Sequence, residues 1–224
     1  MNKGSFRAVL EKGMVLLLAC LLVLGALPAC GYVGSEAEVL AAASGIFEHM
    51  TWISNALYGE GIEAKDPQSG VYGEAVSLPG FLGGKTVDSF KAYLEGIFSR
   101  ELYSLTEYSI FESVKSDTGI LVSYARYYDY LTDEGDSYFM VNTNYEPLVQ
   151  GRMEFDPESL AFVSSSPNRA VVSVDVDVIY TPTEGETQIQ HHPALSMDLV
   201  YEDGVWKLDT APYMNYDPEW EQNG

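Results

Sequence analysis

Two stretches in the first half of the chain carry apolar residues at three- and four-residue steps, the period of an amphipathic helix. The first runs from Glu36 to Leu57 and stops at Gly59 and Gly61. Its apolar positions are Val39, Ala43, Ile46, Phe47, Met50, Ile53 and Leu57. The second follows the N-cap residue Thr86, and its apolar positions are Phe90, Leu94, Ile97 and Phe98. We expect a further short helical piece over Arg100 to Leu105.

The last third of the chain alternates with period two, which is typical of strands with one buried and one solvated face. The clearest run spans Val172 to Tyr180, and Leu195 to Tyr201 repeats the pattern. Asp203-Gly204 then predicts a hairpin turn into a strand from Val205 to Asp209. These segments predict a closing antiparallel meander.

Three shorter β-branched and aromatic runs predict additional strands, over Ile120 to Tyr124, Tyr138 to Val141 and Leu160 to Ser164. The acidic segment from Asp133 to Asp136 lies between the first two. Its residue spacing is not that of an EF-hand calcium loop, so we interpret it as a solvated hairpin tip.

Helices first and antiparallel strands last predict an α+β fold in which N-terminal helices pack on a curved antiparallel sheet that ends in the β-meander. The sequence contains no internal repeat and no linker between domains. We therefore expect a single domain over residues 36–213, followed by a polar tail over residues 214–224.

The first residues have the composition of an export signal. Lys3, Arg7 and Lys12 precede an uncharged run over residues 14–29 that is slightly short for a membrane-spanning helix. The segment Leu27-Pro28-Ala29-Cys30 resembles the lipobox of bacterial lipoproteins, whose cysteine is lipidated. We expect a signal peptide over 1–29, a lipid on Cys30, and a tether over 30–35. This places the protein on the extracytoplasmic face of the cell membrane, and an uncleaved anchor helix would place it on the same side.

The charge of the chain restricts its partners. A formal net charge of −21 disfavours binding to nucleic acid and to anionic lipid, and favours basic or cationic partners. The acidity could equally serve only to keep the protein soluble. Because Cys20 lies in the expected leader and Cys30 at its cleavage point, a disulfide cannot stabilise the mature chain, which must rely on a hydrophobic core.

The last hairpin carries a family resemblance. The run from Val200 to Asp209, with Asp-Gly before Trp-Lys-Leu, resembles the final hairpin of nuclear-transport-factor-2-like and cystatin-like domains. From Thr86 onward the chain is also similar to the bacterial DL-endopeptidase inhibitors of cell-wall hydrolases. The segments that carry this likeness are Val87 to Leu94, Phe98 to Leu102 and Ser166 to Arg169. The resemblance implies a cone-like, cystatin-like fold and an inhibitory activity.

Residues able to carry out catalysis are scarce. The sequence has no Gly-x-Ser-x-Gly elbow, no His-Glu-x-x-His helix and no phosphate-binding glycine loop. His191 and His192 are adjacent, so on a strand they would point to opposite faces and could not easily share a metal ion, and we interpret the pair as part of a loop near Pro193. Asp175 and Asp177 would share one strand face, and inside a closed pocket they could act as an acid–base pair. On an exposed face they would be solvated carboxylates. We expect no metal and no cofactor.

The segment with Tyr124, Arg126, Tyr128 and Tyr130 is a candidate recognition site. Tyrosine offers a large contact area with little loss of rotamer freedom and a polar tip, which suits the recognition of peptides or sugars. Alternatively, some of these tyrosines pack over the helices while the others cover a sheet edge.

Taken together, these features favour a non-enzymatic, lipid-anchored binding module of the bacterial cell envelope that regulates a wall hydrolase. Its partner would be a protein such as that hydrolase, or a small ligand, and not nucleic acid. Two alternatives remain open at this point: a small-molecule carrier or sensor that uses the interior of the cone, and an acid–base enzyme at Asp175 and Asp177.

Overall fold

The computed structural model describes residues 31–65, 70–115, 118, 121–149, 151–182 and 185–213. The expected signal peptide over 1–29, the lipidation site Cys30 and the polar tail over 214–224 lie outside these residues. Within the described residues the fold is α+β, as expected. It has four α-helices and two principal antiparallel sheets, of three and four strands.

The first predicted helix is two helices, α2 (Glu36–Phe47) and α3 (Met50–Leu57). Ser35 caps α2 in a capping box with Glu38, in which each side chain bonds the other residue's backbone N–H. The backbone leaves the helical region at His49 (φ −117°, ψ 11°), where the imidazole ring stacks on Phe81 with 4.0 Å between centroids. The apolar period continues across this break, so the sequence pattern did not reveal it.

The second pair of helices follows the prediction closely. Helix α4 (Val87–Ile97) begins at the predicted N-cap Thr86, and α5 (Arg100–Thr106) begins at the N-cap Ser99. A short 3₁₀ turn, Gly80–Leu82, precedes α4, and a single π turn, Glu107–Phe111, follows α5.

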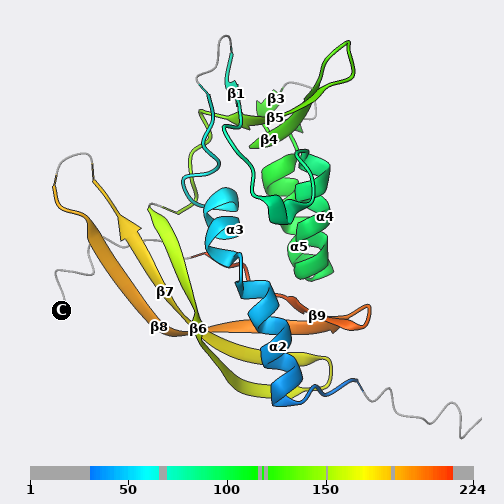
Figure 1. Ribbon diagram of the computed structural model, residues 1–224, viewed down its shortest axis with the longest axis vertical. Coiled ribbons are helices and arrows are strands. Elements are labelled where there is room, and N and C mark those ends of the chain that lie inside the picture. The colour runs from blue at the N-terminus through cyan, green and yellow to red at the C-terminus, as the bar shows by residue number, and fades with distance from the viewer. Residues whose placement is uncertain are drawn as a thin grey trace, which may run out of the picture.

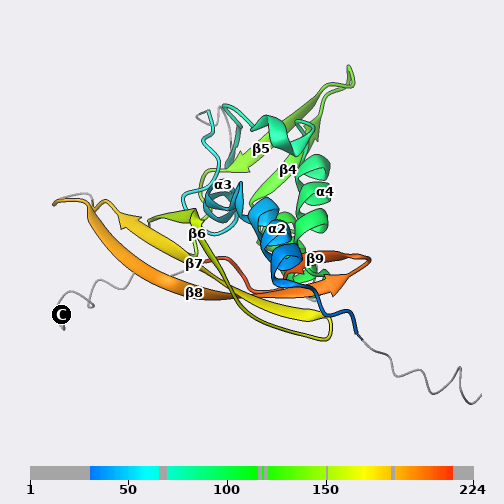
Figure 2. The same cartoon turned by 60° about the horizontal axis from the view of Figure 1, so that its bottom comes forward.

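The four-stranded sheet is the predicted meander preceded by a longer strand, which contains the strand predicted over Leu160 to Ser164. It comprises β6 (Arg152–Ser166), β7 (Arg169–Tyr180), β8 (Gln188–Glu202) and β9 (Val205–Leu208), in the order β6-β7-β8-β9. The predicted alternation is present in β7, where Val172, Val174, Val176 and Val178 are buried. The long strands bend, so that the sheet curves across α2 (Figures 1 and 2).

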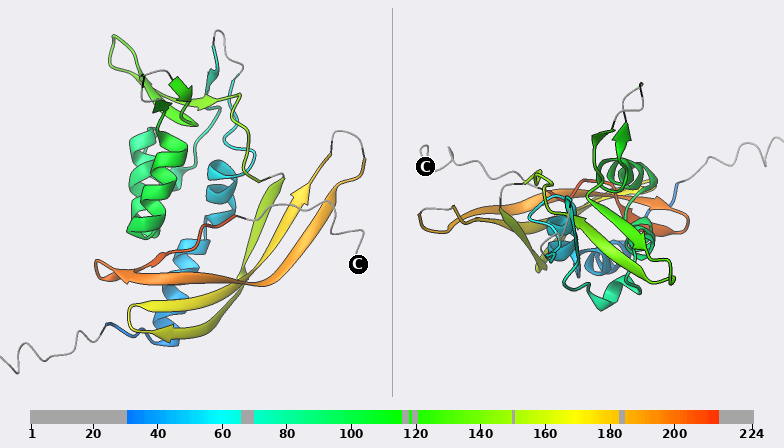
Figure 3. Two further views of the ribbon diagram at one scale, coloured as in Figure 1. Left: turned by 180° about the vertical axis from the view of Figure 1, so that it is seen from behind. Right: turned by 90° about the horizontal axis from the view of Figure 1, so that it is seen from above.

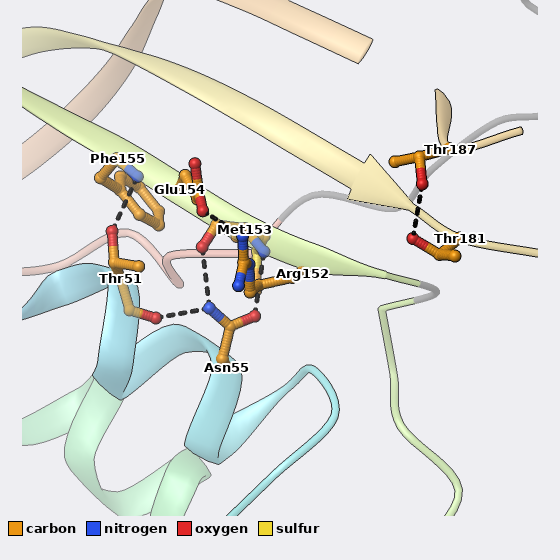
Figure 4. A network of polar contacts seen from close by, with 8 residues as sticks. All are labelled: Thr51, Asn55, Arg152, Met153, Glu154, Phe155, Thr181 and Thr187. Carbon is orange, nitrogen blue, oxygen red and sulfur yellow. Dashed lines mark hydrogen bonds and ion pairs between the residues drawn. The ribbon is translucent and has the colours of Figure 1, made fainter. Parts of the chain in front are cut away.

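Helix α3 is joined to the edge strand β6 by side-chain hydrogen bonds to the backbone (Figure 4). The Asn55 amide donates to the Met153 carbonyl at 2.8 Å and accepts from the Met153 N–H at 2.9 Å. The Thr51 hydroxyl accepts from the Phe155 N–H at 2.9 Å. These side chains supply the partners that another strand would otherwise give, and so protect this part of the sheet edge.

The three-stranded sheet has the order β1-β5-β4, with β1 (Tyr72–Glu74), β4 (Tyr127–Leu131) and β5 (Ser137–Asn142). The predicted hairpin tip connects β4 to β5, where the Asp136 N–H bonds the Thr132 hydroxyl. Strands β2 (Val114–Lys115) and β3 (Leu121–Ser123) form a separate pair. Sequence patterns indicated β3 and β5 but neither β1 nor β4.

The helices lie between the two sheets (Figure 1), and Figure 3 shows the same arrangement from behind. One buried hydrophobic cluster contains residues from the helices and from both sheets. Phe90 and Leu94 come from α4, Tyr127 and Phe139 from the three-stranded sheet, and Val172 to Val178 from β7. The outer face of the three-stranded sheet is left toward solvent.

Candidate functional site

The three-stranded sheet has two faces of different character. Tyr127, Phe139 and Val141 point toward the helices and are buried. The Tyr127 hydroxyl also donates to the Ala56 carbonyl at 2.5 Å. Because strand residues alternate between faces, the intervening positions point away from the core.

Aromatic side chains occupy that outer face. Cross-strand pairing places Tyr130 beside Tyr138, and Tyr128 beside Met140. On the far strand Tyr72 pairs with Asn142 and Glu74 with Met140, which puts them on the same face. Tyr130 and Tyr138 remain 51% and 39% exposed, and Tyr124 is exposed at the border. We call this surface the tyrosine face; its members are Tyr72, Tyr124, Tyr128, Tyr130, Tyr138 and Met140.

Ring contacts order part of the tyrosine face. Tyr72 meets Tyr128 edge-on with 4.5 Å between centroids, and Tyr124 with 6.1 Å. The Tyr72 hydroxyl donates to the Ala125 carbonyl at 2.8 Å. Burial of Tyr72 raises its pKa to about 12, with smaller contributions from Tyr128 and Tyr124, so the phenol stays neutral at physiological pH. The face therefore presents aromatic rings with polar tips on a hydrogen-bonded sheet.

A groove of about 420 Å³ borders the tyrosine face. Tyr138 belongs to both the tyrosine face and the groove wall, and Glu74, on the same side of the sheet, also lines the groove. The rest of the wall includes Val76, Lys85 and Asp136, from beyond β1 and from the β4–β5 hairpin. Charged groups of both signs thus lie beside the aromatic surface, with the acidic hairpin tip next to them.

Arg126, one of the predicted recognition residues, lies inside the protein. It is 2% exposed, and its guanidinium donates to the carbonyls of Leu57 at 2.7 Å and Gly59 at 2.6 Å. The guanidinium carbon also lies 4.5 Å from the ring centroid of Tyr145. These bonds satisfy carbonyl groups at the C-terminal end of α3, which have no partner within the helix. The structure therefore brings Tyr124, Tyr128 and Tyr130 together and separates Arg126 from them.

Asp175 and Asp177 lie on the face of β7 opposite its buried valines. Asp175 accepts from the Ala194 N–H at 2.7 Å, and Asp177 contacts His191 Nδ1 at 2.6 Å. The loop expected near Pro193 is instead part of strand β8, where His192 pairs with the buried Val176, so the two histidines point to opposite faces. Burial lowers the pKa of His192, and no partner of its Nε2 atom is found among the described residues.

Neither a metal site nor a membrane-spanning helix is found in the part of the chain that the structure describes. No group of three or more histidine, cysteine or carboxylate side chains in that part could hold a metal ion. No helix in it has both the length and the apolar character needed to cross a bilayer.

Two central members of the tyrosine face, Tyr138 and Tyr72, were not predicted from the sequence. Tyr138 could have been found from the hairpin tip at Asp133 to Asp136, because folding the chain there brings positions 130 and 138 side by side. For Tyr72 no local signal exists, since its strand pairs with residues about 70 positions further along the chain.

Comparison of the chain with protein-family models, with curated proteins and with solved structures gives no match. The function is therefore inferred from the residues and from their geometry.

Proposed function

We propose that this protein is an exported, lipid-anchored and non-enzymatic binding module of the bacterial cell envelope, and that it recognises its partner through the tyrosine face. One observation carries the proposal. Five tyrosines gather on one side of a short sheet whose other side is part of the core. A folded chain rarely leaves so many large rings on one surface without using them in contact with another molecule.

Binding through these rings should cost little conformational entropy. Tyr128, Tyr130 and Tyr138 stand on paired strands, so their backbones lose little further freedom on binding. A tyrosine side chain has only two χ angles to fix and offers an apolar ring with a polar tip. Such a surface suits a partner that presents flat or partly apolar groups edged by hydrogen-bonding groups.

Within this proposal the partner is a cell-wall DL-endopeptidase, as the resemblance of the segments after Thr86 implies. The tyrosine face would dock at the mouth of the hydrolase and keep peptidoglycan out. The same resemblance implies a cone-like, cystatin-like fold, and the curvature of the four-stranded sheet across α2 supports that part of the proposal (Figure 2). The basic leader and the lipobox-like segment support export and the lipid on Cys30.

The two alternatives have less support. The concave side of the four-stranded sheet is lined by Val172, Val174 and Met197, which are fully or almost fully buried, so a carrier would find little space there. Asp175 and Asp177 are partly exposed and bonded to different partners, which does not favour an acid–base pair.

The test is a pulldown with purified wall endopeptidases, followed by a peptidoglycan hydrolysis assay. We expect the unmodified protein to bind and to slow hydrolysis. The double variant Tyr130→Ala/Tyr138→Ala should bind at least about tenfold more weakly, because truncating aromatic residues at the centre of an interface costs 2 kcal/mol or more. Both rings are exposed, so the variant should unfold at the same urea concentration as the unmodified protein.

Tyr108→Ala is the matched control, because Tyr108 is as exposed as Tyr130 but lies on the π turn after α5. It should bind and inhibit like the unmodified protein. Absence of binding together with unchanged hydrolysis would refute the endopeptidase as partner. Equal losses in Tyr108→Ala and in the double variant would refute the tyrosine face as the contact.

A further inference from the structure

The first described residues are bonded to the body of the domain, although we expected a tether over 30–35. The Tyr32 N–H donates to Oδ1 of Asn168 at 2.6 Å, and the Asn168 N–H donates to the Tyr32 carbonyl at 2.7 Å. Asn168 lies in the β6–β7 turn, and its own carbonyl accepts from the Tyr201 N–H at 2.9 Å. Tyr32 is thus tied into the end of the four-stranded sheet.

Side-chain contacts add to these bonds. The Tyr32 ring stacks on Tyr201 with 4.3 Å between centroids, and its hydroxyl donates to the Glu38 carboxylate at 2.9 Å. The Trp206 ring contacts both of these rings, with 5.3 Å between its centroid and that of Tyr201 and 6.2 Å between its centroid and that of Tyr32. Because Glu38 is also in the capping box of α2, the segment is held to the helix as well as to the sheet.

Two glycines let the backbone approach the domain closely. A Cβ atom on Gly31 would lie 2.7 Å from Pro167, and one on Gly34 would lie 2.7 Å from the Trp206 ring. Either contact is too short for a side chain to fit without movement. Every residue from Gly31 to Ser35 except Val33 therefore has an identified contact with the domain.

The surface around this attachment is apolar and aromatic at its centre, with mixed charges around it. Val33 is 54% exposed and Val205 is 49% exposed. Tyr32, Tyr201, Val205 and Trp206 share the wall of a shallow groove of about 390 Å³. We call the surface formed by Tyr32, Val33, Tyr201, Val205 and Trp206 the anchor end. The nearby charges are Glu38, Glu202 and the Arg100–Asp203 pair.

We propose that the anchor end rests on the lipid head-group layer of the membrane, because residues 31–35 are fixed to the domain and do not form a flexible linker. We call this fixed segment the clamp. This inference rests on the proposed function, which places a lipid on Cys30. With Gly31 already in contact with Pro167, a lipid on the preceding residue has almost no free chain between it and the domain. Trp206 is buried, so the surface offered to lipid is that of Tyr32, Val33 and Val205, and tyrosine is one of the residues enriched at membrane–water interfaces.

The clamp also fixes the direction in which the tyrosine face points relative to the membrane. Helix α2 begins at one end of the longest axis of the molecule, and the β4–β5 hairpin lies at the other end (Figures 1 and 3). A clamped lipid would therefore hold the tyrosine face away from the membrane, toward the cell wall, in a fixed orientation.

Fluorescence quenching in vesicles tests the clamp. The full chain is produced in cells that attach lipid to exported proteins, and it is reconstituted into phosphatidylcholine vesicles containing a small fraction of lipid with a quencher on its head group. One thiol-reactive dye is attached at Val205→Cys in the anchor end, or at Glu134→Cys in the β4–β5 hairpin tip. Once the leader is removed and Cys30 carries lipid, the introduced cysteine is the single free thiol.

We expect a severalfold greater loss of fluorescence at Val205→Cys than at Glu134→Cys. In a Tyr32→Ala/Asn168→Gly background the difference should shrink, because that variant removes the ring stack and the side-chain hydrogen bond. Glycine suits the backbone of position 168, where φ is +60°.

Equal quenching of the dye at positions 205 and 134, in lipidated protein that keeps Tyr32 and Asn168, would overturn the inference. Quenching of Val205→Cys by a dye on another copy of the chain, with no effect of the lipid quencher, would place a second copy on the anchor end and overturn it too. A protein that shows no lipid mass and does not float with vesicles would instead refute the lipid anchor on which the inference rests. Mass spectrometry separates this last failure from the other two.

Discussion

Replacement of Arg126 by methionine tests the assignment of this residue to the protein interior. Methionine keeps an unbranched apolar stem but removes the guanidinium that bonds the carbonyls of Leu57 and Gly59. Both carbonyls would remain close to the core, and the contact with the Tyr145 ring would be lost. If Arg126 supports the end of α3, the variant should be clearly less stable than the unmodified protein.

The expected change in the free energy of unfolding is the difference between two opposing contributions. Hydrogen bonds from a charged donor contribute about 1.5–3 kcal/mol each, so the two bonds together contribute about 3–6 kcal/mol. Removing a buried charge also removes its desolvation cost, which offsets part of that loss. We expect the free energy of unfolding to fall by about 2–4 kcal/mol, a large part of the 5–15 kcal/mol typical of a domain.

Urea unfolding followed by tryptophan fluorescence measures this change. With an m value of about 2 kcal/mol/M, the midpoint should fall by about 1–2 M. Arg152→Met is the control, because Arg152 is exposed and pairs with Glu154 at the surface; it should change stability by less than about 0.5 kcal/mol. If Arg126→Met were as stable as this control but bound its partner more weakly, the guanidinium would have to act in recognition and the structural interpretation would be wrong.

Two other substitutions probe the polar contacts of the four-stranded sheet. Asn55→Asp removes the donor to the Met153 carbonyl and brings a carboxylate close to it. The free energy of unfolding in urea should therefore fall by about 2–3 kcal/mol. Thr187 is exposed, so the control Thr187→Ala should lower it by less than about 0.5 kcal/mol. Burial lowers the pKa of His192, so its contribution to stability is present above the unfolded pKa of about 6.5 and is lost as the pH falls through the folded pKa. The unfolding free energy of His192→Leu should therefore decrease less than that of the unmodified protein when the pH is lowered from about 7.5 to 5. His191 is exposed, so His191→Gln is the control and should keep most of the decrease in unfolding free energy. An unchanged pH dependence in His192→Leu would contradict the role assigned to His192.

Local patterns were sufficient for much of the fold. The alternation from Val172 to Tyr180 identifies β7 because one face of the strand is core and the other is wet, a distinction that is visible in the sequence. Thr86 and Asp203-Gly204 mark a helix start and a hairpin turn through their own backbone chemistry, and both lie where predicted.

The parts that were not predicted depend on residues far apart in the chain. Strand β1 has three residues, and its partner β5 lies more than 60 positions away, so neither its length nor its neighbours mark it as a strand. Strand β4 was missed because Tyr127 and Tyr128 are the same residue type on opposite faces, which removes the contrast between core and solvent. Arg126 resembled a recognition residue because its partners, Leu57 at the end of α3 and Gly59 just after it, are 69 and 67 positions away.

Tyrosine illustrates why composition alone could not define the candidate site. The Tyr127 hydroxyl donates to a helix carbonyl and the ring is buried, so this residue serves the core. The Tyr32 ring is partly exposed, but its hydroxyl and its backbone are both bonded to the domain, so it serves attachment. Tyr130 and Tyr138 have exposed rings, and no hydroxyl bond of either is found within the described residues. Among these four residues, only Tyr130 and Tyr138 combine an exposed ring with a hydroxyl that has no bond within the described residues, so exposure and the partner of the hydroxyl together separate these roles.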